Sequence, residues 1–411
     1  MMDKPLFTIQ YLRAVAAIAV VVGHIAEIYR LDWRLGGAGV DLFFVISGFI
    51  MWLVTRQSEA TPTKFVKKRL LRIVPLYWLV TLFLALSASF LPNLFPLDHP
   101  VLQHVLLSLL FVPHLSPDGR LFPLVSQGWT LNYEMFFYFL FALTVAAPRR
   151  SQFYFVNLLL LGGVVLGYLV TPSSPAGVAY TSPLLIEFLA GIYICRAWLA
   201  NRVFGQKCAW IAVALGLASI AAKDFLDIQL PRVINSGLPA TLIVFGAVSL
   251  ERGNHVVEIR WLKYLGDSSY SIYLTHYLAW LFISIVIAKL GNNIYSLQFF
   301  PVVVCACIAA GVATYSLVER PMVRFFSRIL FKRGLRAPND GGDGHVASSV
   351  GSGGAVTDAN AAAANGNAAM DAVEASSHAP HNIAPDRHPF TRVLPSLHRR
   401  DYHHILPRTT V

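Results

Sequence analysis

The sequence predicts an all-α integral membrane protein with about ten transmembrane helices and with both the N- and the C-terminus in the cytoplasm. Charged residues make up only 13 % of the 411 residues, whereas a soluble domain carries about a quarter. Apolar residues make up 55 %, and the mean hydropathy is +0.56. Long apolar runs also recur along most of the chain. Together these observations exclude an ordinary soluble enzyme and a disordered protein.

Ten apolar runs have the length of a membrane-spanning helix, or fall slightly short of it, which helices in a bundle tolerate. In chain order they lie near residues 9–29, 39–55, 73–91, 129–147, 153–171, 183–199, 208–222, 237–251, 269–289 and 299–318. An eleventh run, 101–115, is only about 15 residues long. Its length favours an interfacial or re-entrant helix.

The positions of Lys and Arg orient the chain, because cytoplasmic loops carry an excess of positive residues. With ten spans and the N-terminus inside, 20 of the 26 basic residues of 1–332 fall on the inner side and six on the outer side. If 101–115 also spanned, the split would be 12 inside against 14 outside. We therefore expect 101–115 on the outer face.

The loop between the second and third spans is the most strongly charged segment, with six basic residues against Glu59, or +5. Its positive charge could hold this loop on the cytoplasmic side of the membrane, and it could also bind an anionic cytosolic ligand. Its basic residues are Arg56, Lys64, Lys67, Lys68, Arg69 and Arg72.

Residues 1–332 form the transmembrane domain, and residues 333–411 are expected to be a disordered cytoplasmic tail. The tail is rich in small and polar residues and cannot bury enough apolar surface to offset its ordering entropy. It holds seven basic and seven acidic residues, so the net charge of +11 lies in 1–332. The basic residues there lie between apolar runs, which indicates contact with membrane lipid and no nucleic-acid binding.

Polar side chains inside the predicted spans are the candidate functional residues, since a charge near the centre of the hydrocarbon costs about 3 kcal/mol or more. Arg13 and His24 are 11 residues apart on the first span, so they share a face and are separated by about 16 Å along the axis. The cysteines and the tail histidines lack ligand spacing, so no metal site is predicted.

The intramembrane polar residues are expected at two depths. The inner half should form a cationic mouth, and the outer half a pocket in which a histidine lies among carboxylates and can act as a general base. A structural charge network is the simpler interpretation of the outer group. The inner group is Arg13, Arg69, Arg72 and His276, and the outer group is His24, Asp41, Glu134 and Glu187.

Six short motifs follow one another along the apolar part of the chain. They read LRAVAAIAVVVGH (12–24), GVDLFFVISGF (39–49), KKRLLRIVPLYW (67–78), WTLNYEMFFY (129–138), SSYSIYLTHY (268–277) and VERP (318–321). In this order they resemble the acyltransferase-3 family of bacterial integral-membrane acyltransferases, over about residues 6–325. The strings GWTLNYEMFFY and GVDLFFVISGFIMW most resemble its exopolysaccharide-production branch.

The resemblance implies that residues 1–332 are a transmembrane acyltransferase domain in the bacterial inner membrane. It implies transfer of an acyl group, usually acetyl, from cytosolic acyl-CoA to a hydroxyl of a cell-surface or exopolysaccharide sugar. The acceptor saccharide could be linked to a lipid. Acetyl-CoA would be a donor substrate, and no cofactor would be bound permanently.

The resemblance also carries over residue by residue. The essential arginine and histidine of the family fall on Arg13 and His24, and the acidic residue of the Trp-x-Leu motif falls on Glu134. The basic motif tied to donor handling falls on Arg69 and Arg72. Many members have a second acidic residue where this chain has Met135, so a mechanism that needs a carboxyl pair does not carry over.

The sequence hypothesis assigns catalysis to His24, Glu134 and Asp41. Arg13, Arg69 and Arg72 would bind the phosphates of the donor. His24 would either deprotonate the sugar hydroxyl or accept the acyl group itself, with Glu134 or Asp41 orienting its ring. Both routes remain open. Further candidates for substrate binding are His276, Trp129 and Ser47.

A proton-coupled transporter or flippase of a lipid-linked saccharide is the alternative, because intramembrane His, Arg and Glu also serve transport. Inverted repeats, which are common in transporters, are not evident in the sequence. A structural scaffold explains neither the placement nor the cost of the buried charges. The motifs therefore favour the acyltransferase.

Overall fold

The computed structural model describes residues 6–31, 33, 35–57, 61–90, 101–226, 230–291, 293 and 295–331. Every element within these ranges is helical, which confirms the predicted all-α class. The tail predicted for residues 333–411 lies outside the described residues.

The long helices coincide with the predicted apolar runs. They are α1 (Phe7–Ile28), α2 (Ala38–Gln57), α3 (Pro62–Phe90), α5 (Trp129–Val145), α6 (Gln152–Val170), α8 (Leu185–Leu199), α9 (Gln206–Phe225), α10 (Leu238–Arg252), α12 (Ser269–Lys289) and α13 (Phe300–Thr314). The shorter elements are η1 (Leu35–Gly37), α4 (Leu102–Leu109), η2 (Ser126–Gly128), α7 (Pro175–Tyr180), η3 (Val233–Gly237), α11 (Arg260–Asp267), η4 (Leu297–Phe299), η5 (Tyr315–Glu319) and α14 (Arg320–Phe331).

Eight helical stretches of the described chain are long and apolar enough to cross a membrane. The other two predicted spans fall on α5, which has 17 residues, and on α9. Helix α4 has only 8 residues, which is too short to span, as expected for the 101–115 run. The number of ten spans and the cytoplasmic position of the termini stay predictions.

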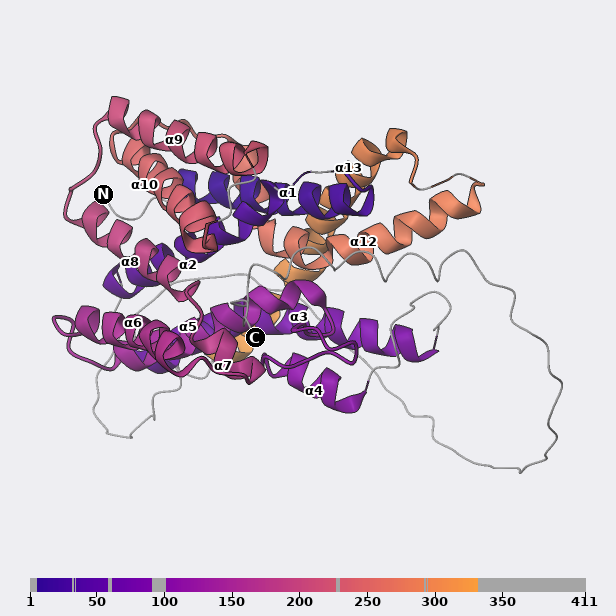
Figure 1. The fold of residues 1–411 in the computed structure, drawn as a ribbon, viewed down its shortest axis with the longest axis horizontal. Coiled ribbons are helices and arrows are strands. Elements are labelled where there is room, and N and C mark those ends of the chain that lie inside the picture. The colour runs from indigo at the N-terminus through magenta and orange to yellow at the C-terminus, as the bar shows by residue number, and fades with distance from the viewer. Residues whose placement is uncertain are drawn as a thin grey trace, which may run out of the picture.

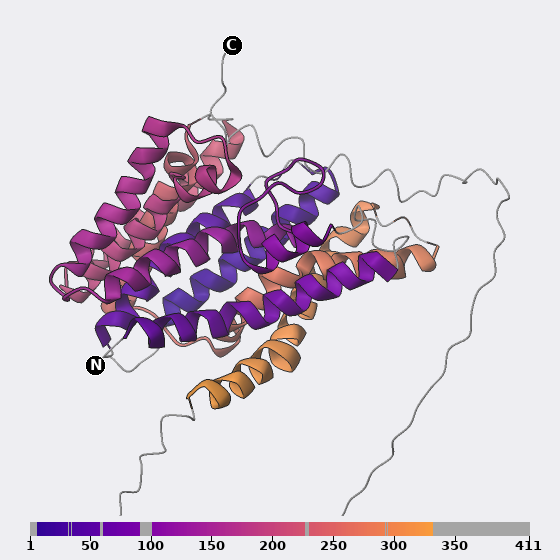
Figure 2. The same cartoon turned by 90° about the horizontal axis from the view of Figure 1, so that it is seen from below.

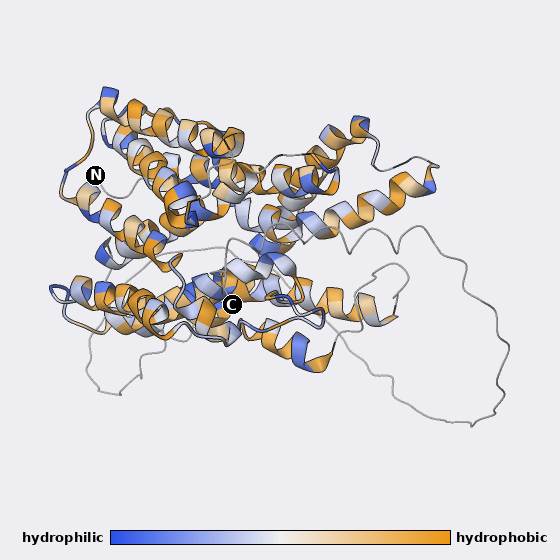
Figure 3. Ribbon diagram, in the orientation of Figure 1, coloured by the Kyte–Doolittle hydropathy of each residue, from blue (hydrophilic) through white to orange (hydrophobic). Residues whose placement is uncertain are grey.

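The outward faces of the helices are apolar. On α6, Leu158 is 67 % exposed and Leu169 is 78 % exposed, and Trp210 on α9 is 55 % exposed. Figure 3 shows hydrophobic residues along most of the long helices. A soluble protein rarely exposes apolar surface on this scale. The chain is therefore a multi-pass membrane protein.

Helix α2 lies in the middle of the bundle, where it packs against α1, α5, α8 and α10. Figure 1 shows α3, α4, α5, α6 and α7 on one side of the molecule, and α9, α10, α1, α12 and α13 on the other. In Figure 2 the long helices run side by side, and the orange α14 leaves the bundle at an angle. The bundle thus has two groups of helices with α2 at their junction.

The contact between α2 and α8 depends on two glycines. A Cβ atom on Gly48 would lie 1.9 Å from the carbonyl oxygen of Phe188, and a Cβ atom on Gly191 would lie 1.9 Å from the carbonyl oxygen of Val45. The two backbones therefore touch, as small residues permit between membrane helices. This contact fixes the position of α2, from which Ser47 reaches the cavity described below.

Two motifs that are far apart in the sequence meet at the start of α12. The Ser271 hydroxyl donates to a carboxylate oxygen of Glu319 at 2.5 Å, and Glu319 is buried. Glu319 closes the π-helical turn η5, a feature that often marks functional sites. The same end of α12 carries Ser269, which accepts a hydrogen bond from Arg13.

Candidate active site

A cavity between α1, α2, α3, α5 and α12 brings together five of the residues predicted from the sequence. Arg13, Ser47, Arg69, Arg72 and Glu134 all line it. Its empty volume, counted with its open mouth, is about 710 Å³. The rest of the wall is largely apolar and aromatic and includes Phe43, Phe44, Tyr138, Tyr270 and Tyr273.

The charged lining of this cavity is three arginines against one glutamate, which amounts to +2 (3 − 1). Arg13 is 6 % exposed, and it donates to neutral partners, to Gln10 at 3.0 Å and to Ser269 at 2.8 Å. The Nε atom of Arg69 is buried without a hydrogen-bond partner. An excess of guanidinium groups over carboxylates in the lining of a cavity favours an anionic ligand.

Two hydroxyl groups hold the carboxylate of Glu134 in the cavity wall. Ser47 donates to its Oε1 atom at 2.8 Å, and Tyr138 donates to the same oxygen from one helical turn further along α5. The sequence had grouped Glu134 with His24 at the outer depth. That grouping is wrong, because Glu134 lines the same cavity as Arg13.

His24 and His276 form a second centre. The Nδ1 atom of His24 lies 2.8 Å from the Nε2 atom of His276, and the two rings stack with centroids 5.1 Å apart. The prediction that His276 lies on the inner half, away from His24, is wrong. Helix α12 begins beside Arg13, which lies about 9 Å along α1 from Phe7. His276 lies about 10 Å further along α12 from that point.

The hydrogen bonds of this histidine pair assign its protons. The Nδ1 atom of His276 lies 2.7 Å from the carbonyl oxygen of Tyr273, and because a carbonyl only accepts, this nitrogen carries the proton. In neutral His276 the Nε2 atom then accepts, and Nδ1 of His24 donates to it. The lone pair of a neutral His24 consequently lies on Nε2, the atom that would take up a proton or an acyl group.

One segment of α12 connects the cavity with the histidine pair. Tyr270 and Tyr273 line the cavity, while His276 and Tyr277 contact the ring of His24. Ser269 also lines the cavity, and it precedes His276 by seven residues, close to two full turns and about 10 Å, so these two residues share a face of α12. A long ligand lying along this face of α12 could therefore touch both centres.

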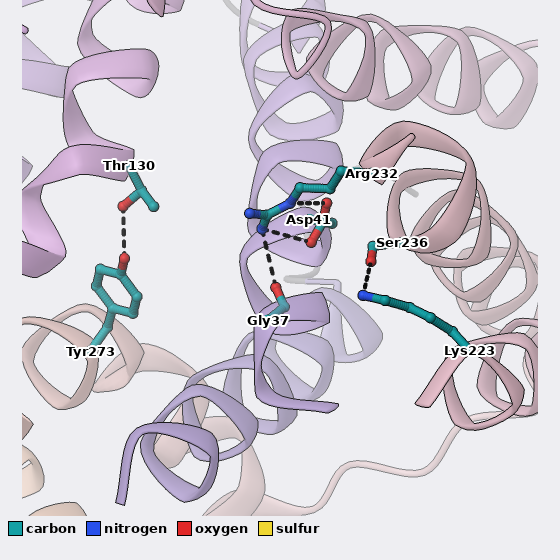
Figure 4. A network of polar contacts seen from close by, with 7 residues as sticks. All are labelled: Gly37, Asp41, Thr130, Lys223, Arg232, Ser236 and Tyr273. Atoms are coloured by element: carbon teal, nitrogen blue, oxygen red, sulfur yellow. Dashed lines mark hydrogen bonds and ion pairs between the residues drawn. The ribbon is translucent and has the colours of Figure 1, made fainter. Parts of the chain in front are cut away.

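Asp41 belongs to a separate, buried ion pair. The Nε and Nη2 atoms of Arg232 donate to its two carboxylate oxygens at 3.1 and 3.0 Å, and Nη2 also donates to the carbonyl oxygen of Gly37 (Figure 4). Asp41 is completely buried. A bidentate pair of this kind fixes both side chains. Asp41 is thus bonded to Arg232 rather than to His24.

Trp129 and Glu187 lie in the same region as this ion pair. The guanidinium carbon of Arg232 is 5.5 Å from the centroid of the Trp129 ring, within the range of a cation–π contact. Glu187 is buried beside Gly237 of the turn that follows Arg232. The next residue of α5, Thr130, lies 2.9 Å from the hydroxyl of Tyr273 (Figure 4). The first turn of α5 therefore links the ion pair to the cavity wall.

The predicted site residues fall into three clusters. The cavity holds five of them, the histidine pair two, and the ion pair with its aromatic neighbour two. Among the residues that the structure describes, no group of three or more His, Cys, Asp or Glu side chains is placed to hold a metal ion. The cavity and the histidine pair share α12, so they form the candidate active site.

Three aromatic residues of the cavity were not predicted from the sequence, namely Tyr138, Tyr270 and Tyr273. All three occur in the quoted motifs, and helical spacing could have found them. Tyr138 follows Glu134 by four residues, and Tyr273 precedes His276 by three, so each lies on the same helix face as its motif partner.

Residues 7–318 match the family model Acyl_transf_3, described as an acyltransferase domain. The chain is 39 % identical over 305 residues to "Exopolysaccharide production protein ExoZ" of Rhizobium meliloti (strain 1021), which covers 73 % of this chain and 94 % of that protein.

More distant similarity links the chain to two proteins named for O-acetyl transfer. It is 25 % identical over 310 residues to "Peptidoglycan O-acetyltransferase OatA" of Listeria monocytogenes serovar 1/2a, which covers 66 % of this chain and 48 % of that protein. It is 25 % identical over 304 residues to "O-acetyltransferase OatA" of Staphylococcus aureus (strain NCTC 8325 / PS 47), with 65 % and 49 % covered. The chain thus spans about half the length of these two proteins. No solved structure matches the chain.

Proposed function

This chain belongs to the acyltransferase-3 family, and we propose that it transfers an acetyl group from cytosolic acetyl-CoA to a hydroxyl of an exopolysaccharide sugar. As a family member it is a membrane acyltransferase, with an acyl donor and a saccharide acceptor. The name of the ExoZ protein supports the acceptor class, and the names of the OatA proteins support acetyl as the group transferred. A cytosolic donor and an outer acceptor require the cytoplasmic membrane.

One observation carries the proposal, namely that a cavity with three arginines shares a face of α12 with the histidine pair. Coenzyme A carries several phosphate charges, for which the planar forks of Arg13, Arg69 and Arg72 are suitable donors. Its long thin arm would run along α12 for the roughly 10 Å between Ser269 and His276. The thioester would then meet His24.

His24 would act through Nε2. As a general base it would take the proton of the sugar hydroxyl while the oxygen attacks the thioester carbonyl, the carbon–sulfur bond breaks and the coenzyme A thiolate leaves with that proton. In the alternative route Nε2 attacks the thioester carbonyl first and the coenzyme A thiolate leaves. The acyl group then passes from the ring to the sugar oxygen, and the proton of the sugar hydroxyl neutralises the thiolate. The motif and the geometry fit both routes.

His276 would be a positioning residue. When His24 gains a proton or an acyl group at Nε2, its Nδ1 atom still donates to Nε2 of His276, which holds the ring in place and stabilises its positive charge. This is the task that the sequence hypothesis gave to Glu134 or Asp41. We reassign Glu134 to the donor cavity, where it offsets part of the arginine charge, and Asp41 to the buried ion pair with Arg232.

The proposal is tested with the purified protein in liposomes that carry acetyl-CoA labelled in the acetyl group inside and the polysaccharide, or its lipid-linked precursor, outside. We expect the label to become alkali-labile and bound to the sugar, with release of free coenzyme A inside. Movement of an unmodified saccharide across the bilayer without label transfer would instead support the transporter.

A further inference from the structure

Helix α14 continues the last apolar stretch of the described chain beyond the length that a bilayer needs. The stretch Leu297–Phe331 has 35 residues, about 52 Å at the rise of an α-helix, whereas the hydrocarbon core is about 30 Å thick. The predicted span 299–318 is by itself long enough to cross that core. Helix α14 therefore begins where the chain reaches the boundary between the acyl chains and the headgroups.

The chain changes direction at this boundary. The π-helical turn η5 precedes α14, and Pro321 is the second residue of α14. Both features bend helices, and Figure 2 shows α14 leaving the bundle at an angle. None of the residues of α14 is buried. Much of its surface is thus available to a partner outside the bundle.

Helix α14 has one basic face and one apolar face. At 100° per residue, Arg320, Arg324 and Arg328 fall within an arc of about 80°. The helix contains no acidic residue, and the next two residues of the sequence, Lys332 and Arg333, are also basic. The exposed apolar side chains of the opposite arc are Phe325, Phe326, Ile329 and Leu330.

Helix α11 contacts the turn from which α14 starts, and its composition indicates the same boundary. The hydroxyl of Tyr264 on α11 lies 2.7 Å from the hydroxyl of Ser316 in η5. Trp261 on α11 is 66 % exposed, and Arg260 is exposed as well. Trp is enriched where lipid meets water, and cytoplasmic loops are enriched in basic residues. The neighbourhood of α14 is therefore suited to the headgroup layer.

We propose that α14 lies in the plane of the membrane surface and binds anionic phospholipid, with Arg324 and Arg328 contacting the phosphates and Phe325 and Ile329 inserted among the acyl chains. An arginine is costly in hydrocarbon, and an exposed phenylalanine is costly in water. A helix that lies in the interface satisfies both faces at once. The Lys and Arg distribution assigns this end of the bundle to the cytoplasm, so the lipid belongs to the inner leaflet.

The first test measures the depth of α14, using the full chain in nanodiscs that contain phosphatidylglycerol. A polarity-sensitive fluorophore is attached to a single introduced cysteine, in a chain whose four native cysteines are replaced by alanine. A label at Ile329→Cys should be quenched by brominated acyl chains, and a label at Arg328→Cys by aqueous iodide. Equal quenching of both labels by iodide would overturn the proposal. Shielding of the Ile329→Cys label that is lost when residues 333–411 are removed would also overturn it, because the tail would then cover this face.

The second test keeps the native cysteines and measures lipid selectivity by native mass spectrometry of the full chain released from mixed nanodiscs. Arg324→Gln combined with Arg328→Gln should lower the retention of phosphatidylglycerol relative to phosphatidylcholine by about threefold or more, because arginines at an anionic surface favour binding.

The matched control is Arg150→Gln combined with Arg202→Gln, which removes two exposed arginines from other loops that are expected in the cytoplasm. This control should keep the lipid ratio of the wild type. Equal ratios in the wild type and in the α14 double variant would overturn the proposal, and so would equal losses in the two double variants, because the charge of the whole molecule would then explain the selectivity.

Discussion

The Nδ1 atom of His24 on α1 lies 2.8 Å from the Nε2 atom of His276 on α12, and the two rings are stacked. This contact joins the first and the fifth sequence motif, which are more than 240 residues apart (|i−j| = 252). In this contact the ring of His24 meets the ring of His276, which in turn is held by the main-chain carbonyl of Tyr273.

If His276 positions His24, the acceptor atom matters more than the ring. His276→Phe removes the acceptor and should lower kcat for acetyl transfer by about 10- to 100-fold, while KM for acetyl-CoA stays nearly constant. His276→Asn keeps an acceptor oxygen and should recover part of kcat. Steady-state kinetics at equal amounts of protein in the membrane check this. Equal kcat in the wild type and in His276→Phe would remove His276 from the mechanism.

The arginines of the cavity should act on the donor. We expect Arg69→Ala and Arg72→Ala to raise KM for acetyl-CoA more than KM for the saccharide, because they line the cavity proposed for the phosphates. Lys in place of either Arg should rescue poorly, since an ammonium group cannot form the bidentate contact. Lys68→Ala, on the same helix but outside the cavity lining, is the control. A larger effect on the saccharide would contradict the assignment.

The Asp41–Arg232 pair should be structural. Asp41→Asn removes the bidentate partner of the partly buried guanidinium of Arg232, beside which Glu187 remains, and should destabilise the protein by about 1–3 kcal/mol. The double variant Asp41→Leu with Arg232→Met removes both charges and should recover most of the melting temperature and of the acetyl transfer. A double variant that is as stable as the wild type but inactive would return Asp41 to the catalytic residues.

The charge distribution predicts the side of the membrane on which each loop lies. A reporter fused at Ser116 should be found outside, and one fused after residue 332 should be found in the cytoplasm. Alkaline phosphatase and green fluorescent protein fusions measure these two sides independently. A cytoplasmic Ser116 would exclude the ten-span arrangement.

The helices could be predicted from the sequence because a helix in lipid needs a long apolar run. The predicted runs near 9–29 and 269–289 begin and end within two residues of the ends of α1 and α12. The cost of a charge in the membrane also singled out Arg13, Arg69 and Glu134, all of which line the cavity. These features depend on each helix by itself, which is why a single sequence reveals them.

The partners of the polar residues could not be predicted, since they depend on how far one helix is displaced along another. Helix α12 starts beside Arg13 on α1, and its next two turns bring His276 to His24. The bidentate contact that occupies Asp41 comes from Arg232, a residue that the charge count treated only as part of an outer loop.

The central claim is that Nε2 of His24 takes the proton or the acyl group. His24→Ala and His24→Gln are measured beside the wild type, each at equal abundance in the membrane, for transfer of labelled acetyl from acetyl-CoA to polysaccharide. The account predicts that both variants lose activity by about 10²–10⁴-fold, because Gln can keep a hydrogen bond to His276 but cannot accept a proton or an acyl group. Turnover by His24→Gln close to that of the wild type would contradict the account and would make the histidine a structural residue.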